Sequence, residues 1–504
     1  MTKTDIVLIV PFQEKAAFGP RLLDSYLTYN GFSVALVYFK RRTQENSSPS
    51  SIEMQLLVDF IIAKSPLLIG ISFMSVFRDV VASIINGIKA KTNIPIITGG
   101  VHATICPEDC LELADICCIG DGEVPLKMLL NQLKTGKLRS DIPNCYFRNG
   151  SEVIKNPMTY VCTDLDKLPF QDLTSTGKYF IEDDKIMNED PYISYIRNSK
   201  KYDFKAYRGC PYCCTYCGND SIRAAYGTKG KFLRRRSVEN VILELKMAKS
   251  TFPDLQSMGS YDEVFLSDPD FVREFAERYS KEIALPLSCD TYITTASEEM
   301  VTMMANAGLK RVAVGIEAFS EEVRTKVYMR YQKDSDLLAK IKIFDHHGIQ
   351  LSYDFILDNP YEKPEDIRNF FLDFITKLPR PCYFNFYSLC HLPKSKLTYR
   401  LLADGLITED DIVGLSNKGV LQWKVTKKHA RSPRITFWID MMVLFSHTVN
   451  LGGWKLHIPI SLIKLIGRLE NAFVLRTATF AYNVFAAVSE GNIMNIVLKK
   501  VGIK

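Results

Sequence analysis

Apolar runs and amphipathic stretches alternate along the first 145 residues. Short apolar runs, which predict buried strands, lie at Ile6–Val10, Val34–Tyr38, Leu67–Ser72 and Ile94–Thr98. Longer stretches with helical spacing separate them, at Arg21–Tyr29, Ile52–Ala63 and Asp79–Lys89. This alternation is typical of a parallel sheet with helices on both faces. We therefore expect a doubly wound α/β domain over residues 1–145.

Small and polar residues follow these strands, where ligands bind in open parallel sheets. They form the stretches Ser72-Phe73-Met74-Ser75, Gly99-Gly100-Val101-His102-Ala103-Thr104 and Gly120-Asp121-Gly122-Glu123. A dinucleotide-binding domain is the simplest interpretation. However, Pro11-Phe12-Gln13-Glu14 stands after the first strand in place of the G-x-G-x-x-G that such domains use. The paired glycines therefore predict a different large ligand.

A second alternation begins at residue 203. Before it, residues 146–200 are rich in turn formers and acidic residues and predict a linker, with a small hairpin around Asn149-Gly150. Strands are then predicted at Asp203–Tyr207, Glu263–Leu266, Leu285–Asp290, Arg311–Ile316, Leu351–Leu357 and Tyr383–Leu389. Helices are predicted between them at Pro269–Lys281, Ser297–Ala307, Leu337–His347 and Pro364–Leu378. Six β/α units predict a partial, TIM-like (β/α)6 barrel over residues 201–400, with its chemistry at the carboxyl ends of the strands.

The alternation ends after Lys394, and residues 401–504 predict a helical C-terminal region. Residues 435–504 hold seven Lys or Arg residues against three acids, and Leu462–Leu469 and Ala478–Val488 have helical periodicity. Trp438 and Trp454 stand among large apolar neighbours. This region is expected to cap the barrel over a substrate. The alternative is an amphipathic surface that lies on a membrane or receives a lipid-like substrate.

The composition is that of a globular protein with two or three domains, since 47% of the 504 residues are hydrophobic and 24% are charged. A net charge of +6 is too small to indicate nucleic acid as a partner. The first residues resemble a strand more than a signal peptide, and uncharged runs stop short of the roughly 18 residues of a spanning helix. Thirteen cysteines without a secretion signal predict a reducing cytoplasmic location, where clustered thiols indicate metal or redox chemistry.

Four cysteines fall within eight residues, in the stretch Arg208-Gly209-Cys210-Pro211-Tyr212-Cys213-Cys214-Thr215-Tyr216-Cys217. Cys210, Cys214 and Cys217 form C-x3-C-x2-C, three thiolates that can bind a cubane iron–sulfur cluster and leave its fourth iron open. A zinc site would use the two C-x2-C pairs, but adjacent Cys213 and Cys214 side chains diverge too strongly for tetrahedral binding. A disulfide needs an oxidising compartment, which nothing in the chain indicates. We therefore predict an iron–sulfur cluster.

The cysteine stretch resembles the motif of the radical S-adenosylmethionine (SAM) superfamily, C-x3-C-x-aromatic-C, with Tyr216 at the aromatic position. The resemblance implies that Cys210, Cys214 and Cys217 hold a [4Fe-4S] cluster. Its open iron would bind SAM, and electron transfer would cleave SAM to methionine and a 5′-deoxyadenosyl radical.

Later strand ends resemble the same superfamily. The resemblance implies that Asp268 contacts the SAM amino group, with Asp270 as a weaker candidate, although Asp268 before Pro269 also suits a helix N-cap. It implies that Glu317, in Val314-Gly315-Ile316-Glu317, approaches the ribose or methionine part of SAM. The stretch from Tyr353 to Glu362 resembles the D-N-P-Y-E segment of the cobalamin-linked subgroup.

The N-terminal domain is similar to the cobalamin-binding domain that precedes many radical SAM domains, with G-G-x-H-A-T followed by G-x-G-E. The resemblance implies that cobalamin is contacted by Ser72, Ser75, Gly99, Gly100, His102, Gly120, Gly122 and Glu123. The cobalt-ligating motif D-x-H-x-x-G is missing, since no histidine precedes His102. Cobalamin is then expected without a protein histidine on its lower face, and His102 is expected near the corrin or its tail.

Together these resemblances imply a cobalamin-dependent enzyme similar to the class B radical SAM methyltransferases, acting on an unactivated carbon. Cobalt(I) would take a methyl group from one SAM, and a substrate radical made with a second SAM would collect it. Two alternatives stay open: rearrangement or oxidative cyclisation without methyl transfer, and a non-catalytic cobalamin-responsive binding protein. The expected partners are a small-molecule or lipid-like substrate and a flavodoxin- or ferredoxin-type reductant, with peripheral membrane contact as a further hypothesis.

The assignment of three ligands among four cysteines predicts unequal effects of substitution. Cys213→Ala should keep the cluster and SAM cleavage because Cys213 is spare, whereas Cys214→Ala should abolish both. Iron and sulfide content and 5′-deoxyadenosine formation after anaerobic reconstitution measure these outcomes. The opposite result would overturn the C-x3-C-x2-C assignment.

Overall fold

The computed structural model describes residues 4–13, 17–41, 49–136, 138–227, 232–413, 433–446, 449–451 and 454–456. The chain divides into two compact units. The first unit comprises Met1–Cys289 and Cys390–Leu421, and the second comprises Asp290–Leu389 and Gln422–Lys504.

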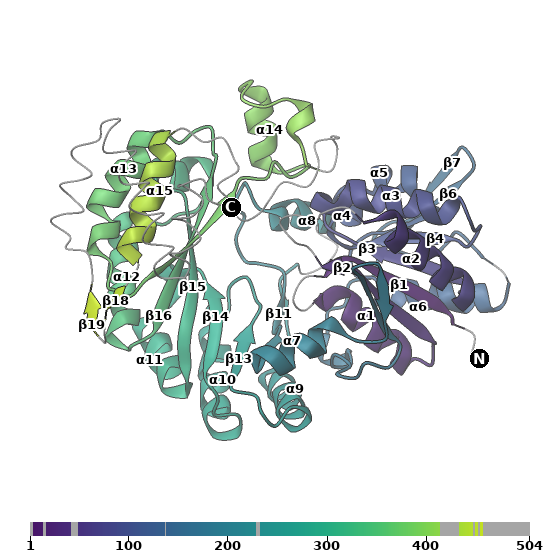
Figure 1. Cartoon of the computed structure of the whole chain (residues 1–504), viewed down its shortest axis with the longest axis horizontal. Coiled ribbons are helices and arrows are strands. Elements are labelled where there is room, and N and C mark those ends of the chain that lie inside the picture. Colours follow the sequence, from purple (N-terminus) through teal and green to yellow (C-terminus); the bar gives the residue numbers. More distant parts are fainter. Residues whose placement is uncertain are drawn as a thin grey trace, which may run out of the picture. The chain divides into compact units, whose positions relative to one another are not determined.

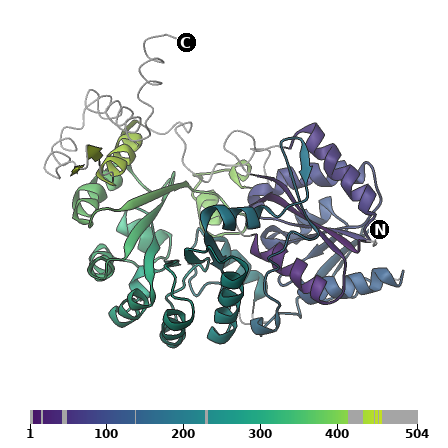
Figure 2. The same cartoon turned by 60° about the horizontal axis from the view of Figure 1, so that its bottom comes forward.

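A nine-stranded sheet with the order β7-β6-β5-β4-β3-β1-β2-β8-β9 forms the N-terminal part of the first unit (Figure 1). Its parallel strands are β1 (Ile6–Gln13), β2 (Val34–Arg41), β3 (Leu68–Ser72), β4 (Ile96–Gly99) and β5 (Ile116–Cys118). Figures 1 and 2 show helices on both faces of this sheet. One face carries α1 (Phe18–Tyr29) and α6 (Glu123–Lys134), and the other carries α2 (Ser51–Lys64), α3 (Arg78–Lys89) and α5 (Pro107–Leu113). The doubly wound α/β architecture predicted from the sequence is confirmed.

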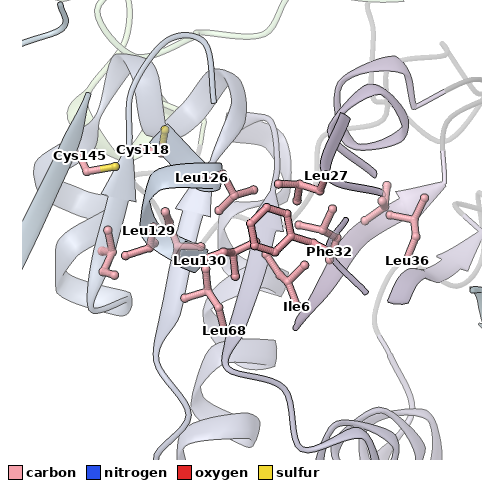
Figure 3. Packing of buried hydrophobic residues seen from close by; sticks show 14 of the residues in the cluster. Ile6, Leu27, Phe32, Leu36, Leu68, Cys118, Leu126, Leu129, Leu130 and Cys145 are labelled. Atoms are coloured by element: carbon pink, nitrogen blue, oxygen red, sulfur yellow. The ribbon is translucent and has the colours of Figure 1, made fainter. Parts of the chain in front are cut away.

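The central strands are apolar on both sides because helices cover both faces of the sheet. Ile6 and Leu8 of β1 belong to the core under α1 and α6, while Val7 and Ile9 are buried on the opposite side. Figure 3 shows the packing of the first core. Its labelled members are Ile6, Leu27, Phe32, Leu36, Leu68, Cys118, Leu126, Leu129, Leu130 and Cys145.

The stretch predicted as a linker adds strands to both edges of this sheet. The hairpin predicted around Asn149-Gly150 is present, as β6 (Cys145–Asn149) and β7 (Glu152–Lys155), and β6 pairs with β5. At the other edge, β8 (Lys178–Glu182) pairs in parallel with β2 and carries β9 (Lys185–Met187). The sequence pattern missed β8 and β9. Their sequences Lys-Tyr-Phe-Ile-Glu and Lys-Ile-Met hold only short apolar runs next to charged residues. The four-part division at residues 145, 200 and 400 stays a prediction.

After α7 (Pro191–Ser199), three parallel strands follow, β10 (Lys201–Phe204), β13 (Ser257–Ser260) and β14 (Leu287–Thr291). The first unit ends within β14, at Cys289. Helices α9 (Val238–Thr251) and α10 (Pro269–Glu282) connect the three strands. A two-stranded antiparallel ribbon of β11 (Tyr207–Arg208) and β12 (Arg234–Arg235) follows β10, and α8 (Gly218–Tyr226) lies between the two ribbon strands in sequence.

The strand predicted at Glu263–Leu266 is wrong. Phe265 and Leu266 are fully buried, but they lie in the turn that leads into α10. The strand is β13, whose sequence Ser-Met-Gly-Ser has no apolar run to reveal it. A Cβ on Gly259 would overlap side-chain atoms of Asp203 and Lys201 on β10, so a larger residue there would have to displace these two side chains.

The second unit contains the parallel strands β15 (Leu309–Glu317), β16 (Gln350–Leu357) and β17 (Tyr383–Ser388). Its helices include α11 (Glu298–Ala307), α12 (Asp334–His346), α13 (Pro364–Asp373) and α15 (Pro433–Ser446). The three strands and α11, α12 and α13 lie at the predicted ranges, except that α13 ends at Asp373 and a short 3-10 turn follows at Ile375–Lys377. No range was predicted for α15. Trp438 of α15 is fully buried and its ring lies 5.5 Å from that of Phe371.

The described C-terminal elements are α14 (Lys396–Ala403), α15 and the antiparallel pair β18 (Val449–Leu451) and β19 (Trp454–Leu456). The helices predicted at Leu462–Leu469 and Ala478–Val488 lie outside the described residues. Within the described ranges, every helix is too short or too polar to cross a bilayer.

Candidate functional site

The loops predicted to bind cobalamin meet at one cavity of about 350 Å³ in the first unit. The cavity lies beyond the carboxyl ends of β3, β4 and β5, beside the position where the strand order reverses at β1. Six of the predicted residues line it, namely Ser72, Gly99, Gly100, Gly120, Gly122 and Glu123. Residues beyond the predicted loops also line it, among them Leu165, Leu168–Gln171, the stretch Lys205–Arg208, Arg236 and Glu244. Residues far apart in the sequence therefore complete one pocket.

The glycines of this wall have different reasons to be glycine. Gly100 begins α4 (Gly100–Ile105) with a φ of +88°, and a Cβ there would lie 2.8 Å from Ser72 Oγ and 3.0 Å from the backbone of Phe73. Gly120 has a φ of +69°, and its Cβ would lie 2.9 Å from Met158 Cε. Gly99 has an extended backbone, and no atom of the described chain lies within 4 Å of its added Cβ. The fold requires Gly100 and Gly120, whereas only a close ligand would require Gly99.

His102 and Ser75 are not among the residues that line the cavity. His102 is fully buried, with Nδ1 2.9 Å from Ser75 Oγ and Nε2 2.9 Å from Asp109 Oδ2. Burial alone would raise the pKa of Asp109, but hydrogen bonds from His102 and Arg78 outweigh it and lower that pKa. Both nitrogens of the histidine ring are therefore used inside the domain, and the imidazole supports α4 from behind.

Glu123 and Asp121 of the Gly120–Glu123 turn bind Arg208, which stands two residues before Cys210. Arg208 Nη2 donates to Glu123 Oε1 at 2.5 Å, and Nη1 donates to Asp121 Oδ1 at 3.2 Å. All three side chains line the cavity. Burial acts to lower the pKa of Arg208, but Glu123 and Asp121 outweigh it and raise that pKa. The guanidinium therefore stays charged in a buried place because two carboxylates face it.

Asp121 is an anchor for several segments, and the sequence prediction did not include it. It accepts hydrogen bonds from Tyr226 Oη at 3.0 Å, from the backbone nitrogen of Cys162 at 2.8 Å and from Arg234 Nη1. Burial acts to raise the pKa of Asp121, but Arg208 and Arg234 outweigh it and lower that pKa. Asp121 stands in the Gly120-Asp121-Gly122-Glu123 turn, and Arg208 stands two residues before Cys210. Both residues therefore lie in or beside a motif that the sequence pattern singled out.

The cysteine motif occupies the loop between β11 and α8. Cys210 and Cys214 are buried and Cys217 is half-buried at the N-cap of α8, whereas Cys213 is exposed. The helix N-terminus favours negative charge at this place. Tyr216 is half-buried within the same loop. Across the described ranges, no three His, Cys, Asp or Glu side chains are gathered around a point that would hold a single metal ion. Cluster ligation by Cys210, Cys214 and Cys217 stays a prediction.

Side chains from outside the motif hold the backbone of this loop. Arg223 of α8 donates to the carbonyl oxygens of Cys210 and Tyr212, the latter at 3.1 Å. Gly209 has a φ of +88°, and a Cβ there would overlap the carbonyl of Phe232. The backbone nitrogen of Leu397 donates to the carbonyl of Thr215 at 3.0 Å. The conformation of the loop is thus determined largely by its surroundings.

Asp262 holds the segment that enters the loop and was also missed by the sequence prediction. Its carboxylate accepts from the backbone nitrogens of Ala206 and Tyr207 at 3.0 and 2.8 Å, and from Ser260 Oγ at 2.8 Å. The side chain is 1% exposed, and burial raises the pKa of Asp262 to about 6.

A second cavity, of about 420 Å³, lies beside the cysteine loop. Its wall includes Pro211 and Tyr212 of the loop together with Arg235 and Asp268. Asp268 is the N-cap of α10, where it accepts from the backbone nitrogen of Phe271 at 3.1 Å, and it also pairs with Arg235. The predicted SAM-binding carboxylate therefore lies in one cavity with the loop and has structural partners of its own. Asp270 is exposed and pairs with Arg273.

In the second unit, Glu317 ends β15 with a φ of +74°, after an irregularity in the strand at Gly315. A Cβ on Gly315 would overlap the carboxylate of Glu317, so that carboxylate lies against the glycine. Glu362 of the D-N-P-Y-E segment accepts from the backbone nitrogens of Phe319 and Ser320 at 2.6 and 2.8 Å. The segment therefore fixes the turn that follows Glu317, and contact of Glu317 with SAM stays a prediction.

Two family models match the chain, one at each predicted cofactor region. The B12 binding domain model matches residues 5–130, and the Radical SAM superfamily model matches residues 204–374. The chain therefore contains a B12-binding domain and a radical SAM domain. These families imply the cofactors expected from the sequence, a [4Fe-4S] cluster, SAM and cobalamin.

Solved structures support this fold assignment. The structure of the methyltransferase TsrM from Kitasatospora setae, with cobalamin and a [4Fe-4S] cluster bound, matches with a TM-score of 0.63 at 18% identity, over 80% of this chain and 78% of that chain. The cobalamin-dependent SAM radical enzyme OxsB, with aqua-cobalamin bound, matches with a TM-score of 0.59 at 16% identity, over 96% of this chain and 73% of that one. At these identities the likeness concerns the fold.

A curated relative is similar in sequence over part of its length. An uncharacterized methyltransferase of Pyrococcus horikoshii is 24% identical over 285 residues, which cover 55% of this chain and 56% of that protein. The match thus spans little more than half of the relative.

The chemistry of the cavity wall fits a ligand that carries hydrogen-bond donors, as cobalamin does. Gly99 leaves open space at the wall, and Oε2 of the buried Glu123 has no hydrogen-bond partner among the described residues. A buried carboxylate oxygen of this kind calls for a donor. Ser72 and the glycines of the wall would lie along the corrin.

The adjacent glycines at positions 99 and 100 are expected to respond differently to alanine. Gly100→Ala should lower the melting temperature of the apoprotein because the Cβ meets Ser72 and Phe73 in a left-handed backbone. Gly99→Ala should leave the melting temperature unchanged but weaken hydroxocobalamin binding by about tenfold, since its methyl group enters the cavity. Thermal unfolding and equilibrium dialysis measure the two effects. Unchanged cobalamin affinity in Gly99→Ala would remove this loop from the cobalamin site.

The pKa of Asp262 predicts a pH-dependent stability difference. Because the folded pKa is about 6 and lies above the usual value of 3.8, the folded chain keeps this proton longer than the unfolded chain does. The free energy of unfolding of the wild type should therefore fall relative to Asp262→Asn as pH rises to 6, by up to about 3 kcal/mol, and then stay level. Melting temperatures between pH 4.5 and 7.5 test this. The control is Asp254→Asn at an exposed position, because water surrounds that carboxylate in both states. A wild type that gains stability relative to Asp262→Asn over this range would contradict the prediction.

Proposed function

We propose that this protein is a cobalamin-dependent radical SAM methyltransferase that acts on an unactivated carbon of a small molecule. The observation that carries the proposal is the position of Arg208. It lies in the wall of the cavity assigned to cobalamin and two residues before Cys210, the first cysteine assigned to the cluster. The half-buried side chain of Arg208 therefore lines the cavity assigned to cobalamin, while its backbone leads into the loop assigned to the cluster.

Methyl transfer is favoured by the descriptions of related proteins. TsrM is described as a radical SAM methyltransferase, with a structure that holds tryptophan as substrate, and the Pyrococcus horikoshii relative is named as a methyltransferase. OxsB is described only as a cobalamin-dependent SAM radical enzyme, so rearrangement or cyclisation without methyl transfer is the second candidate.

Under this proposal, each group of residues has a defined task. Cys210, Cys214 and Cys217 hold the cluster, Asp268 and Glu317 contact SAM, and the Gly99–Gly100 and Gly120–Glu123 loops contact cobalamin. When bound, these cofactors supply a carbon-centred radical and a methyl group. The chain orients them and the substrate and excludes water from the reacting atoms.

Further parts of the proposal concern organisation and partners. The cobalamin domain comprises residues 1–145, the linker 146–200, the barrel 201–400 and the C-terminal region 401–504. A flavodoxin- or ferredoxin-type protein supplies electrons. Residues 435–504 are basic and apolar. They cap the barrel over a small-molecule or lipid-like substrate, or they contact a membrane surface.

The products formed from SAM distinguish the candidate functions. The protein is reconstituted anaerobically with iron, sulfide and hydroxocobalamin, then reduced and given SAM with a deuterated methyl group. Methyl transfer predicts 5′-deoxyadenosine together with S-adenosylhomocysteine, and a deuterated methyl group recovered on the corrin by mass spectrometry. Deoxyadenosine alone would favour rearrangement, and neither product would favour a binding protein. Cys214→Ala is the control for any reaction that bypasses the cluster.

A further inference from the structure

The two carboxylate oxygens of Glu123 have different surroundings. Oε1 accepts from Arg208 Nη2 at 2.5 Å, while Oε2 is buried and has no hydrogen-bond partner in the described chain. The residue is 3% exposed, begins α6 and lines the cavity of about 350 Å³. A buried carboxylate oxygen without a hydrogen-bond donor is costly, so this atom is suited to accept a hydrogen bond from a ligand in the cavity.

We propose that Glu123 is a positioning residue that links cobalamin binding to the conformation of the cysteine loop. Its Oε2 accepts a hydrogen bond from a side-chain amide of the corrin ring, and its Oε1 holds Arg208. The corrin periphery carries primary carboxamides, whose N–H groups are donors of the required kind. This inference rests on the part of the proposed function that assigns the cavity to cobalamin, and it adds a route by which one cofactor influences the place of the other.

A shift of the Arg208 guanidinium group affects the backbone of the cysteine loop. It lies on β11, and Gly209, which has a φ of +88°, separates it from Cys210. The backbone at Gly209 is packed against the carbonyl of Phe232, so it has little room to absorb a shift of its neighbour. The carbonyl of Cys210 is in turn held by Arg223. A change in the position of the guanidinium therefore reaches the backbone of Cys210.

Asp121 has a different part from Glu123, although both bind Arg208. Its oxygens already accept from Tyr226, from Arg234 and from the backbone nitrogen of Cys162. These partners belong to the fixed frame of the first unit and leave Asp121 little freedom to follow a ligand. His102 is excluded as the link because Ser75 and Asp109 occupy both of its ring nitrogens. Glu123 is therefore the member of this group with an oxygen available to the ligand.

The test measures the affinity for hydroxocobalamin by equilibrium dialysis, with and without the reconstituted cluster. If cobalamin binding affects the cysteine loop, the cluster must affect cobalamin affinity by the same factor, because coupling between two sites is reciprocal. In the wild type, the two dissociation constants should therefore differ, by about tenfold. In Glu123→Gln the affinity should fall by about tenfold and the difference between the two states should disappear. A glutamine side chain has one oxygen and one NH2 group. The NH2 group would face either the amide N–H of the corrin or the guanidinium group of Arg208, and both of these are hydrogen-bond donors.

Two further variants separate sensing from transmission. Arg208→Lys keeps the charge but cannot bridge Glu123 and Asp121 with a planar fork, so the difference between the affinities measured with and without the cluster should disappear. The exposed Glu112→Gln carries the same substitution in the same domain and should behave as the wild type in both measurements. Arg208→Lys also keeps the test informative should Glu123→Gln fail to fold.

The source of the amide is tested with cobinamide, which keeps the corrin amides and lacks the nucleotide tail. Glu123→Gln should weaken cobinamide and cobalamin binding equally. The inference is overturned by a loss confined to cobalamin, by an unchanged affinity in Glu123→Gln or by a wild type whose affinity ignores the cluster. None of these measurements uses SAM, so absence of methyl transfer with coupling intact would overturn the proposed reaction and leave this inference standing.

Discussion

Two carboxylates and two guanidinium groups share a buried volume in the first unit, and the surrounding loops depend on their being together. Asp121 and Glu123 lie within hydrogen-bond distance of Arg208, and Asp121 also binds Arg234. The side chains of Asp121, Glu123 and Arg234 are nearly inaccessible to water, whereas that of Arg208 is 23% exposed. Removal of one member would leave an uncompensated buried charge, which typically costs about 3–5 kcal/mol. The group is neutral as a whole, and this neutrality permits polar residues at a place that the fold keeps from water.

The backbone of the cysteine loop is held mainly by contacts with residues outside the C-x3-C-x2-C motif. The spacing of Cys210, Cys214 and Cys217 sets which thiols can meet. The backbone that carries them is fixed from outside, by Asp262 at its entrance and by Arg223 behind it. These contacts use carbonyl and amide groups of the loop, so they constrain its path without occupying the cysteine side chains.

The sequence was informative where one local pattern determines one local structure. Strands β1 to β4 and helices α1 to α3 were predicted because their apolar residues recur in patterns that are typical of buried strands and of helices packed on a sheet. Strand β13 was missed because Ser257–Ser260 has no apolar run, although its neighbours enclose it. Glu123 was found through its G-x-G-E turn. The pairing of Asp121 with Arg208, 87 residues apart, was not, because a contact between distant loops leaves no periodicity in either. Asp262 was missed for the same reason, since its partners are backbone groups more than 50 residues away.

The cavity wall also shows that the cobalamin region is not a portable module. Residues within the range that matches the B12 binding domain supply only part of the enclosure. The remainder comes from Leu165, Leu168–Gln171, Lys205–Arg208, Arg236 and Glu244. Arg21 ties the first of these stretches to the sheet through Gln171 and the carbonyl of Asp172, at 3.1 and 2.8 Å. A fragment cut at the end of the B12-binding sequence would therefore expose the floor of its own pocket to solvent. Transfer of residues 5–130 alone to another protein would therefore leave behind the part of the cavity wall that later segments supply, as far along the chain as Glu244.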